Sequence, residues 1–144
     1  MNYAVKYAKS DVGYAATFPD FPGLEAKAAT PEETQSAAYE ALISKLMSFM
    51  ENGLPVPLPQ EKPNPAYISL LASVPPKILL HNLVVSQNKT RSWVAAQMGV
   101  TRQVMTRLFN LRESTKVETI QNALDTLGYE MFVTIEPKPQ NVQF

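Results

Sequence analysis

Five prolines within fourteen residues limit the folds that this chain can adopt. The segment at positions 52–65 reads NGLPVPLPQEKPNP. Each proline fixes its own φ angle and lacks an amide hydrogen, so neither a helix nor a central strand can continue through the segment. We therefore expect an extended connector. This connector closes a first domain over residues 1–72. A second domain follows over 73–136, and then a tail over 137–144.

The residues before the connector predict three strands. YAVKYA at 3–8 alternates in the manner of a half-buried strand, and GYAATF at 13–18 follows a turn sequence, which indicates a hairpin. A third strand is expected near 24–29, after the turn PDFPG. A fourth, at 66–72, can return to the same sheet after the prolines.

One long helix is expected between the third and fourth strands. Thr30 can cap it, Pro31 suits its first position, and Glu33 completes a capping-box pattern. Its apolar residues recur at helical spacing and define an inward stripe made of Ala38, Leu42, Leu46 and Phe49. The N-terminal part therefore has the order strand, strand, strand, helix, strand.

From Pro75 onward the pattern becomes helical. PPKILLHNLVVSQ predicts a helix with Ile78, Leu79 and Leu83 facing inward. STKVETIQNALDTLG predicts a later helix, whose expected inward residues are Val117, Ile120, Leu124 and Leu127.

Between these two helices, a glycine corner separates two short ones. Thr90 and Thr101 are N-cap residues, and Gly99 can end the first helix in the left-handed conformation, which costs glycine little. This spacing predicts a helix-turn-helix, in which the second helix enters the DNA major groove. Similar helix pairs also occur in proteins that never bind DNA. The expected inner faces are Val94, Ala95 and Met98 in the first helix, and Met105, Leu108 and Phe109 in the second.

All four arginines of the chain fall between positions 90 and 116. If Met105 points inward, the helical period turns Gln103 and Arg107 outward, and these side chain types pair with adenine and guanine edges. Arg91 begins the preceding helix, where we expect it to hold a phosphate. The expected DNA-binding residues are Arg91, Thr101, Arg102, Gln103, Thr106, Arg107, Asn110, Arg112 and Lys116.

The formal net charge of zero conceals an asymmetry. Residues 1–71 carry a charge of −3 and residues 72–144 carry +3, while the segment 77–116 alone carries +6. Such a division indicates that one half faces a polyanion and the other half faces a different partner. The alternative is charge scattered over two solvated surfaces.

Two resemblances cover nearly the whole chain. VAAQMGVTRQVMTRLFN with KVETIQNALDTLG resembles the helix-turn-helix domains of the phage-repressor (lambda-like, Xre) family. GYAATFPDFPGLEAKAATPEE with the exit GLPVPLPQ resembles the N-terminal domain of HicB antitoxins. The shared motifs are Gly13, the Phe-Pro-Asp-x-Pro-Gly turn at 18–23, the acidic pair Glu32-Glu33 and the prolines from Pro55 to Pro59. Lys27-Ala28-Ala29 and Thr34 depart from the family pattern.

The resemblance implies an α+β fold and a role. The N-terminal domain would be a partial ribonuclease-H-like βββαβ unit that binds and inhibits a HicA-type mRNA-cleaving toxin, a small basic protein. The C-terminal, lambda-repressor-like domain would bind operator DNA and repress its own type II toxin–antitoxin operon. The acids Asp20 and Glu25 are candidate toxin contacts.

The sequence favours no enzyme. A ribonuclease-H site needs about four carboxylates that converge on two Mg²⁺ ions. Asp11 and Asp20 lie in turns, the interiors of the first two strands carry no acid, and Glu25 is expected on the solvent face of the third. His81, the single histidine, has no nucleophile or ligand partner and is expected to be a packing or surface residue. We expect no catalytic residue, metal or cofactor.

The N-terminus and the hydropathy indicate a cytoplasmic protein. The chain has no cysteine, which excludes disulfides. It has no apolar run of about 18 residues and no signal-peptide pattern, so neither a membrane partner nor export is expected.

The terminal segment YEMFVTIE, 129–136, alternates as a strand would. One recognition helix reads about one half-site, so a homodimer or a dimer of dimers is expected, held by this strand pairing with its twin. Alternatively, the strand folds back onto the N-terminal sheet. The expected dimerisation residues are Tyr129, Met131, Phe132, Val133 and Ile135.

Two other functions remain open at this stage. The chain could be a stand-alone helix-turn-helix repressor whose N-terminal domain senses a small ligand, or a degenerate nuclease. A neighbouring reading frame for a small basic protein would favour the antitoxin over the repressor. Hydrolysis of RNA in the presence of Mg²⁺ would favour the nuclease.

Overall fold

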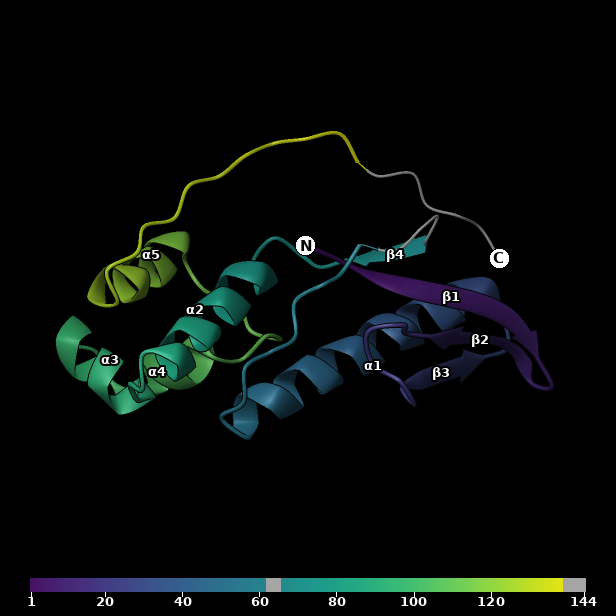
Figure 1. The fold of residues 1–144 in the computed structure, drawn as a ribbon, viewed down its shortest axis with the longest axis horizontal. Coiled ribbons are helices and arrows are strands. Elements are labelled where there is room, and N and C mark those ends of the chain that lie inside the picture. Colours follow the sequence, from purple (N-terminus) through teal and green to yellow (C-terminus); the bar gives the residue numbers. More distant parts are fainter. Residues whose placement is uncertain (62–65, 139–144) are drawn as a thin grey trace. The chain divides into compact units, whose positions relative to one another are not determined.

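The computed structural model describes residues 1–61 and 66–138, which form a mixed α+β fold with one antiparallel sheet and five helices (Figure 1). The α+β class predicted from the sequence is confirmed. The chain divides into two compact units, the first built on Met1–Lys45 and Pro57–Leu70, the second on Leu46–Val56 and Leu71–Glu136. No helix in the described part of the chain is long and apolar enough to cross a membrane.

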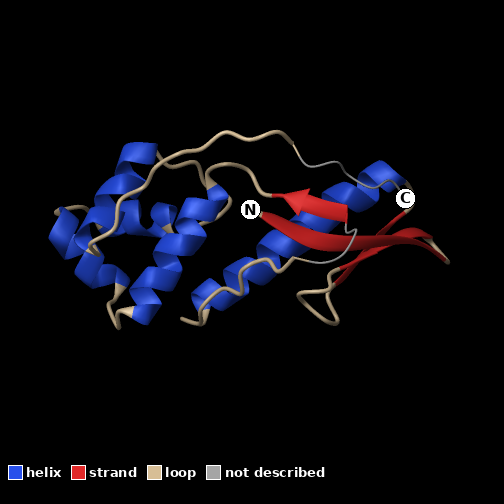
Figure 2. Cartoon of the chain, turned by 45° about the horizontal axis from the view of Figure 1, so that its top comes forward, coloured by secondary structure: helices blue, strands red, loops and turns tan. Residues whose placement is uncertain are grey.

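The sheet of the first unit has the strand order β3-β2-β1-β4, and every neighbouring pair is antiparallel. Its strands are β1 (Asn2–Ser10), β2 (Gly13–Thr17), β3 (Glu25–Ala28) and β4 (Ala66–Ser69). The helix α1 (Pro31–Glu51) lies between β3 and β4 in the sequence and runs along one face of the sheet (Figure 2). The predicted βββαβ order is therefore confirmed.

The β1–β2 hairpin depends on Gly13. Ser10 pairs with Gly13 across the turn, and Gly13 adopts a φ of 135°, which is open to glycine but not to ordinary side chains. A Cβ atom placed on Gly13 would lie 2.5 Å from the carbonyl oxygen of Ala28 and 2.7 Å from that of Ala29. The hairpin can therefore pack against the end of β3 only because this position lacks a side chain.

Tyr3 lies at the centre of the first unit's core. Its ring is fully buried and packs against Phe21 with centroids 5.6 Å apart, and its hydroxyl donates to the carbonyl of Pro57 at 2.7 Å. Burial, with a smaller contribution from Asp20, raises the pKa of the Tyr3 hydroxyl. Much of the rest of this core comes from β1, β2 and α1, and includes Ala4, Val5, Ala16, Ala38, Leu42 and Ile43; β3 and β4 add Ala26, Ala66 and Ile68.

The second unit contains α2 (Val74–Ser86), α3 (Arg91–Met98), α4 (Arg102–Leu108) and α5 (Val117–Thr126). The inward positions predicted for Ile78, Ile120, Leu124 and Leu127 are confirmed, because all four are buried.

Two inward assignments were wrong, because Leu79 and Val117 are exposed. The buried stripe of α2 runs through Val74, Ile78 and His81, and Leu79 lies about 100° around the helix from Ile78. Val117 opens α5. A long helical side chain covers the turn N-terminal to its own Cα, and the first residue of a helix has no such turn.

The predicted terminal strand is absent from the single chain. Residues 129–136 have no regular secondary structure. A strand here would turn Tyr129, Met131, Val133 and Ile135 toward the helices, but these residues form no buried face. Phe132, Val133 and Ile135 are 83%, 79% and 98% exposed. A strand needs a partner backbone for its hydrogen bonds, and among the described strands none pairs with this segment.

Candidate functional site

The glycine corner joins α3 to α4 as the sequence predicts. Thr90 caps α3 by accepting a hydrogen bond from the amide of Trp93 at 2.9 Å, and Thr101 caps α4 by accepting from Val104 at 3.4 Å. Gly99 ends α3 in the left-handed conformation, with φ of 68° and ψ of 34°. The direction of α4 is therefore set by two caps and one glycine, all encoded locally.

The two faces of α4 differ in chemistry. Met105, Leu108 and Phe109 are buried, as predicted. The opposite face is exposed and carries a guanidinium, an amide, a hydroxyl and a second guanidinium, from Arg102, Gln103, Thr106 and Arg107. We call these four residues the α4 polar face.

A concave surface borders the α4 polar face. It encloses about 620 Å³ between α3 and α4, and its lining includes Arg91, Ser92, Ala95, Arg102, Met105 and Thr106. The small side chains of Ser92 and Ala95 leave this space open, because larger residues there would fill it. The surface can therefore receive a protruding, negatively charged group beside Arg102.

Arg91 lies differently from the other predicted DNA contacts. Its Nη2 donates to the carbonyl of Met50 at 3.3 Å, and its guanidinium lies over the Phe109 ring, 4.4 Å from the ring centre. Burial lowers the pKa of Arg91, although nearby Glu51 opposes that shift. This arginine holds α3 against the end of α1 and the end of α4, so its charge is less available to a phosphate than the sequence suggests.

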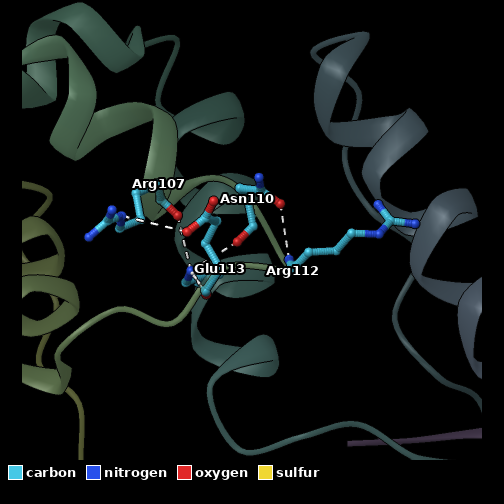
Figure 3. A network of polar contacts seen from close by, with 5 residues as sticks. Arg107, Asn110, Arg112 and Glu113 are labelled. Carbon is cyan, nitrogen blue, oxygen red and sulfur yellow. Dashed lines mark hydrogen bonds and ion pairs between the residues drawn. The ribbon is translucent and has the colours of Figure 1, made fainter.

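The remaining predicted contacts lie in the segment after α4. Arg112 donates its amide to the side chain of Asn110 at 3.0 Å (Figure 3). Its Nη1 lies 2.8 Å from the sulfur of Met47. Lys116 is exposed at the start of α5, where its side chain makes no capping bond.

A buried lysine that the sequence analysis did not single out anchors this segment. The ammonium of Lys77 donates to the carbonyls of Arg107 at 3.0 Å, Asn110 at 2.9 Å and Glu113 at 2.7 Å. Three donors thus meet three acceptors at the C-terminal end of α4, where a helix leaves carbonyls unpaired and favours positive charge. Burial lowers the pKa of Lys77, Glu113 raises it, and Arg107 lowers it further.

The sequence contained a signal for this lysine. Lys77 follows Val74 by three residues and precedes His81 by four, so it lies on the same stripe as these buried residues. Lys77 is fully buried, so its share of the +6 charge of residues 77–116 does not lie on the surface.

His81 is a packing residue, one of the two roles expected for it. It is buried, and its Nε2 donates to the carbonyl of Leu54 at 2.8 Å. Burial lowers the pKa of His81, so the neutral ring is favoured. Its neighbour Asn82 accepts from the amide of Val56 at 2.7 Å and donates to the carbonyl of Val56 at 3.0 Å. These bonds hold the start of the proline-rich exit, which explains why Leu46–Val56 belongs to the second unit.

The first unit carries a smaller hollow that Glu25, one of the two acids expected to contact the toxin, helps to line. It encloses about 340 Å³, and its lining includes Lys6, Thr17, Phe18, Pro19, Pro22, Gly23, Leu24 and Glu25. Glu25 is exposed and lies 3.2 Å from Lys27, whereas Asp20 is half-buried near Tyr3. In residues 1–61 and 66–138, no three His, Asp or Glu side chains gather closely enough to hold a metal ion.

The described part of the chain thus combines a sheet unit with a helical unit whose helix α4 exposes two arginines. The chain belongs to the HicB-like antitoxin family: the family model described as a HicB_like antitoxin of bacterial toxin-antitoxin system matches residues 2–78. This confirms the HicB resemblance seen in the sequence.

Curated relatives extend the similarity over most of the chain. Antitoxin HicB 2 of Photorhabdus laumondii is 33% identical over 89% of this chain and 91% of its own length. Antitoxin HicB of Escherichia coli K12 is 32% identical over 83% of this chain and 87% of its own length. These relatives are named as antitoxins and not as enzymes, in agreement with the prediction of no catalytic activity.

Proposed function

We propose that this protein is the antitoxin of a type II HicAB system, which inhibits a HicA-type mRNA-cleaving toxin and represses its own operon. The N-terminal domain, about residues 1–72, is a partial ribonuclease-H-like unit that binds the toxin. The C-terminal domain, about 73–136, is a lambda-repressor-like helix-turn-helix domain that binds the operator. Since mRNA and operator DNA are both in the bacterial cytoplasm, the protein acts there.

The α4 polar face is the observation that best supports the proposed DNA binding. Arg102 and Gln103 lie in the first turn of α4, and Arg107 lies one turn further along the same exposed side. Arginine pairs with the O6 and N7 atoms of guanine, glutamine pairs with adenine, and a helix of this kind reaches these base edges through the major groove. Arg112 and Lys116, in the segment after α4, hold the DNA backbone on one side of the groove.

Replacing Arg107 with alanine tests this assignment. We expect operator affinity to fall by about 1–3 kcal/mol, with relaxed preference at one base pair, because a bidentate contact to guanine is lost. Arg107→Lys keeps the charge but lacks the planar fork, so it should keep the salt dependence and still lose the base preference. Mobility-shift titrations of the operon's upstream DNA would measure both effects.

A matched control is Lys9→Ala, which removes an exposed positive charge from β1 in the first unit. It should leave operator affinity unchanged, and all three variants should still inhibit the toxin. If Arg107→Ala binds the operator as tightly as the unmodified protein, α4 does not read DNA through this face.

The acidic character of the first unit supports toxin binding there. Residues 1–71 carry a net charge of −3, which suits a small basic nuclease. Glu25 is exposed beside the 340 Å³ hollow, so it can meet a positive group of the toxin directly. Asp20, the other candidate contact, is half-buried.

Assembly through residues 129–136 gives a second prediction. A chain truncated after Gly128 should run as a smaller species and lose tight operator binding, because one recognition helix reads only one of two half-sites about 34 Å apart. Pairing of two copies would cover Phe132, Val133 and Ile135, which are exposed in the single chain. Light scattering and operator titration would measure mass and affinity. An unchanged mass after truncation would place the dimer contact elsewhere.

A further inference from the structure

Glu113 is the single acid among residues 77–116, and it lies beside the α4 polar face. Its Oε2 is 3.6 Å from the Nε of Arg107, and the two side chains are 49% and 66% exposed (Figure 3). An exposed pair of this kind contributes little to folding. Glu113 lies next to Arg107, the expected base contact, so its effect is expected on DNA binding and not on folding.

The backbone around Glu113 is fixed by hydrogen bonds. Its amide donates to the carbonyl of Asn110 at 3.2 Å, and its own carbonyl accepts from the buried Lys77 at 2.7 Å. Asn110 in turn donates its amide to the carbonyl of Arg107 at 3.2 Å. Because the turn is held at both ends, the Glu113 carboxylate stays near Arg107 with less loss of conformational entropy than in an ordinary surface pair.

The carboxylate contacts Arg107 at Nε, which leaves the terminal nitrogens Nη1 and Nη2 for another partner. Those two nitrogens form the fork that pairs with the O6 and N7 atoms of guanine. A carboxylate that holds Nε orients the fork before DNA arrives, so less rotamer entropy is lost on binding. It also repels phosphates, and this repulsion weakens binding to DNA of any sequence.

We propose that Glu113 is a specificity-determining residue of the operator-binding surface. It positions Arg107 through Nε for a guanine edge, and its negative charge weakens phosphate contacts with every duplex, so tight binding depends on the base contact. The inference rests on the proposed function of the α4 polar face as the element that reads DNA.

A double-mutant cycle tests the proposal. Fluorescence anisotropy would measure the affinity of the full chain for the operon's upstream duplex and for a scrambled duplex of the same length, at several salt concentrations. The variants are Glu113→Gln, Glu113→Asp, Arg107→Ala, the double variant Glu113→Gln/Arg107→Ala and Asp125→Asn. Asp125→Asn is the matched control, because it removes one exposed negative charge from α5 in the same unit.

Glu113→Gln should bind the scrambled duplex on the order of threefold to tenfold more tightly, as expected for one lost repulsive charge at the DNA surface. The operator should gain less, so the ratio of operator to scrambled affinity should fall. This fall should disappear in the Arg107→Ala background, because Glu113 acts through Arg107. Glu113→Asp keeps the charge on a shorter side chain, and should keep weak scrambled binding while losing part of the ratio.

Two results would overturn the proposal. One is an equal effect of Glu113→Gln and Asp125→Asn on both duplexes, which would show a net-charge effect alone. The other is an equal fall of the ratio with and without Arg107. If the unmodified protein showed no preference for the operator, the proposed DNA-binding function itself would fail, and the inference with it.

Discussion

Replacing Lys77 with methionine is expected to lower the free energy of unfolding of the second unit by about 3 kcal/mol. Methionine keeps much of the apolar stem but removes the ammonium that donates to the carbonyls of Arg107, Asn110 and Glu113. Two of these carbonyls also accept backbone hydrogen bonds, from Asn110 and Glu113 respectively. Among the hydrogen bonds described above, the carbonyl of Glu113 accepts only from Lys77, so the substitution would leave this carbonyl without a donor.

Urea denaturation followed by the fluorescence of Trp93 would measure this effect. Trp93 is the single tryptophan of the chain and lies in α3, so its signal reports on the second unit. The control is Lys116→Met, which removes an exposed lysine of the same unit, and it should change stability by less than about 0.5 kcal/mol. Equal stability of the Lys77→Met variant and the unmodified protein would show that the three bonds to Lys77 contribute nothing net.

Replacing Gly13 with alanine is expected to destabilise the first unit by about 3 kcal/mol or more. One contribution is the cost of a φ of 135° for a residue with a side chain. The other is the approach of the new Cβ to the carbonyl oxygens of Ala28 and Ala29 at 2.5 and 2.7 Å. These are backbone atoms, so no side chain rotation can relieve the clash, and β2 must separate from β3.

The matched control is Gly23→Ala. Gly23 also has a positive φ, of 89°, but nothing lies within 4 Å of its expected Cβ. It should therefore show the conformational cost alone, about 1 kcal/mol. Amide hydrogen exchange of the β1–β2 hairpin would compare the two variants, while Trp93 fluorescence checks that the second unit stays folded. Loss of toxin inhibition in Gly13→Ala without loss of operator binding would agree with separate roles for the two domains. Similar exchange rates in both variants would contradict the steric argument.

Much of the fold follows from local signals in the sequence. Thr30, Thr90 and Thr101 each accept a capping hydrogen bond from an amide three residues later, so the starts of α1, α3 and α4 can be predicted from short sequence windows. The exposed side of α4 also follows from its own periodicity once Met105 is placed inward. These features need no knowledge of distant parts of the chain.

The features that the sequence did not show depend on distant partners. Lys77 meets carbonyls that lie 30, 33 and 36 residues away, and Arg91 meets a carbonyl 41 residues away. The stripe of α2 indicates that Lys77 is buried, but no short sequence window shows which carbonyls Lys77 and Arg91 meet. The alternation of 129–136 is a true property of the sequence, but a strand forms only when a second backbone supplies the hydrogen bonds.

The exposed apolar side chains of residues 129–136 have a consequence for gene dosage. If two copies cover this segment on each other, the amount of paired protein at low concentration grows with the square of the amount of chain made. A twofold rise in chain would then produce about a fourfold rise in the species that occupies both half-sites. Repression by this protein would respond more steeply to small changes in the synthesis or removal of the chain than repression by a regulator that binds DNA as single chains.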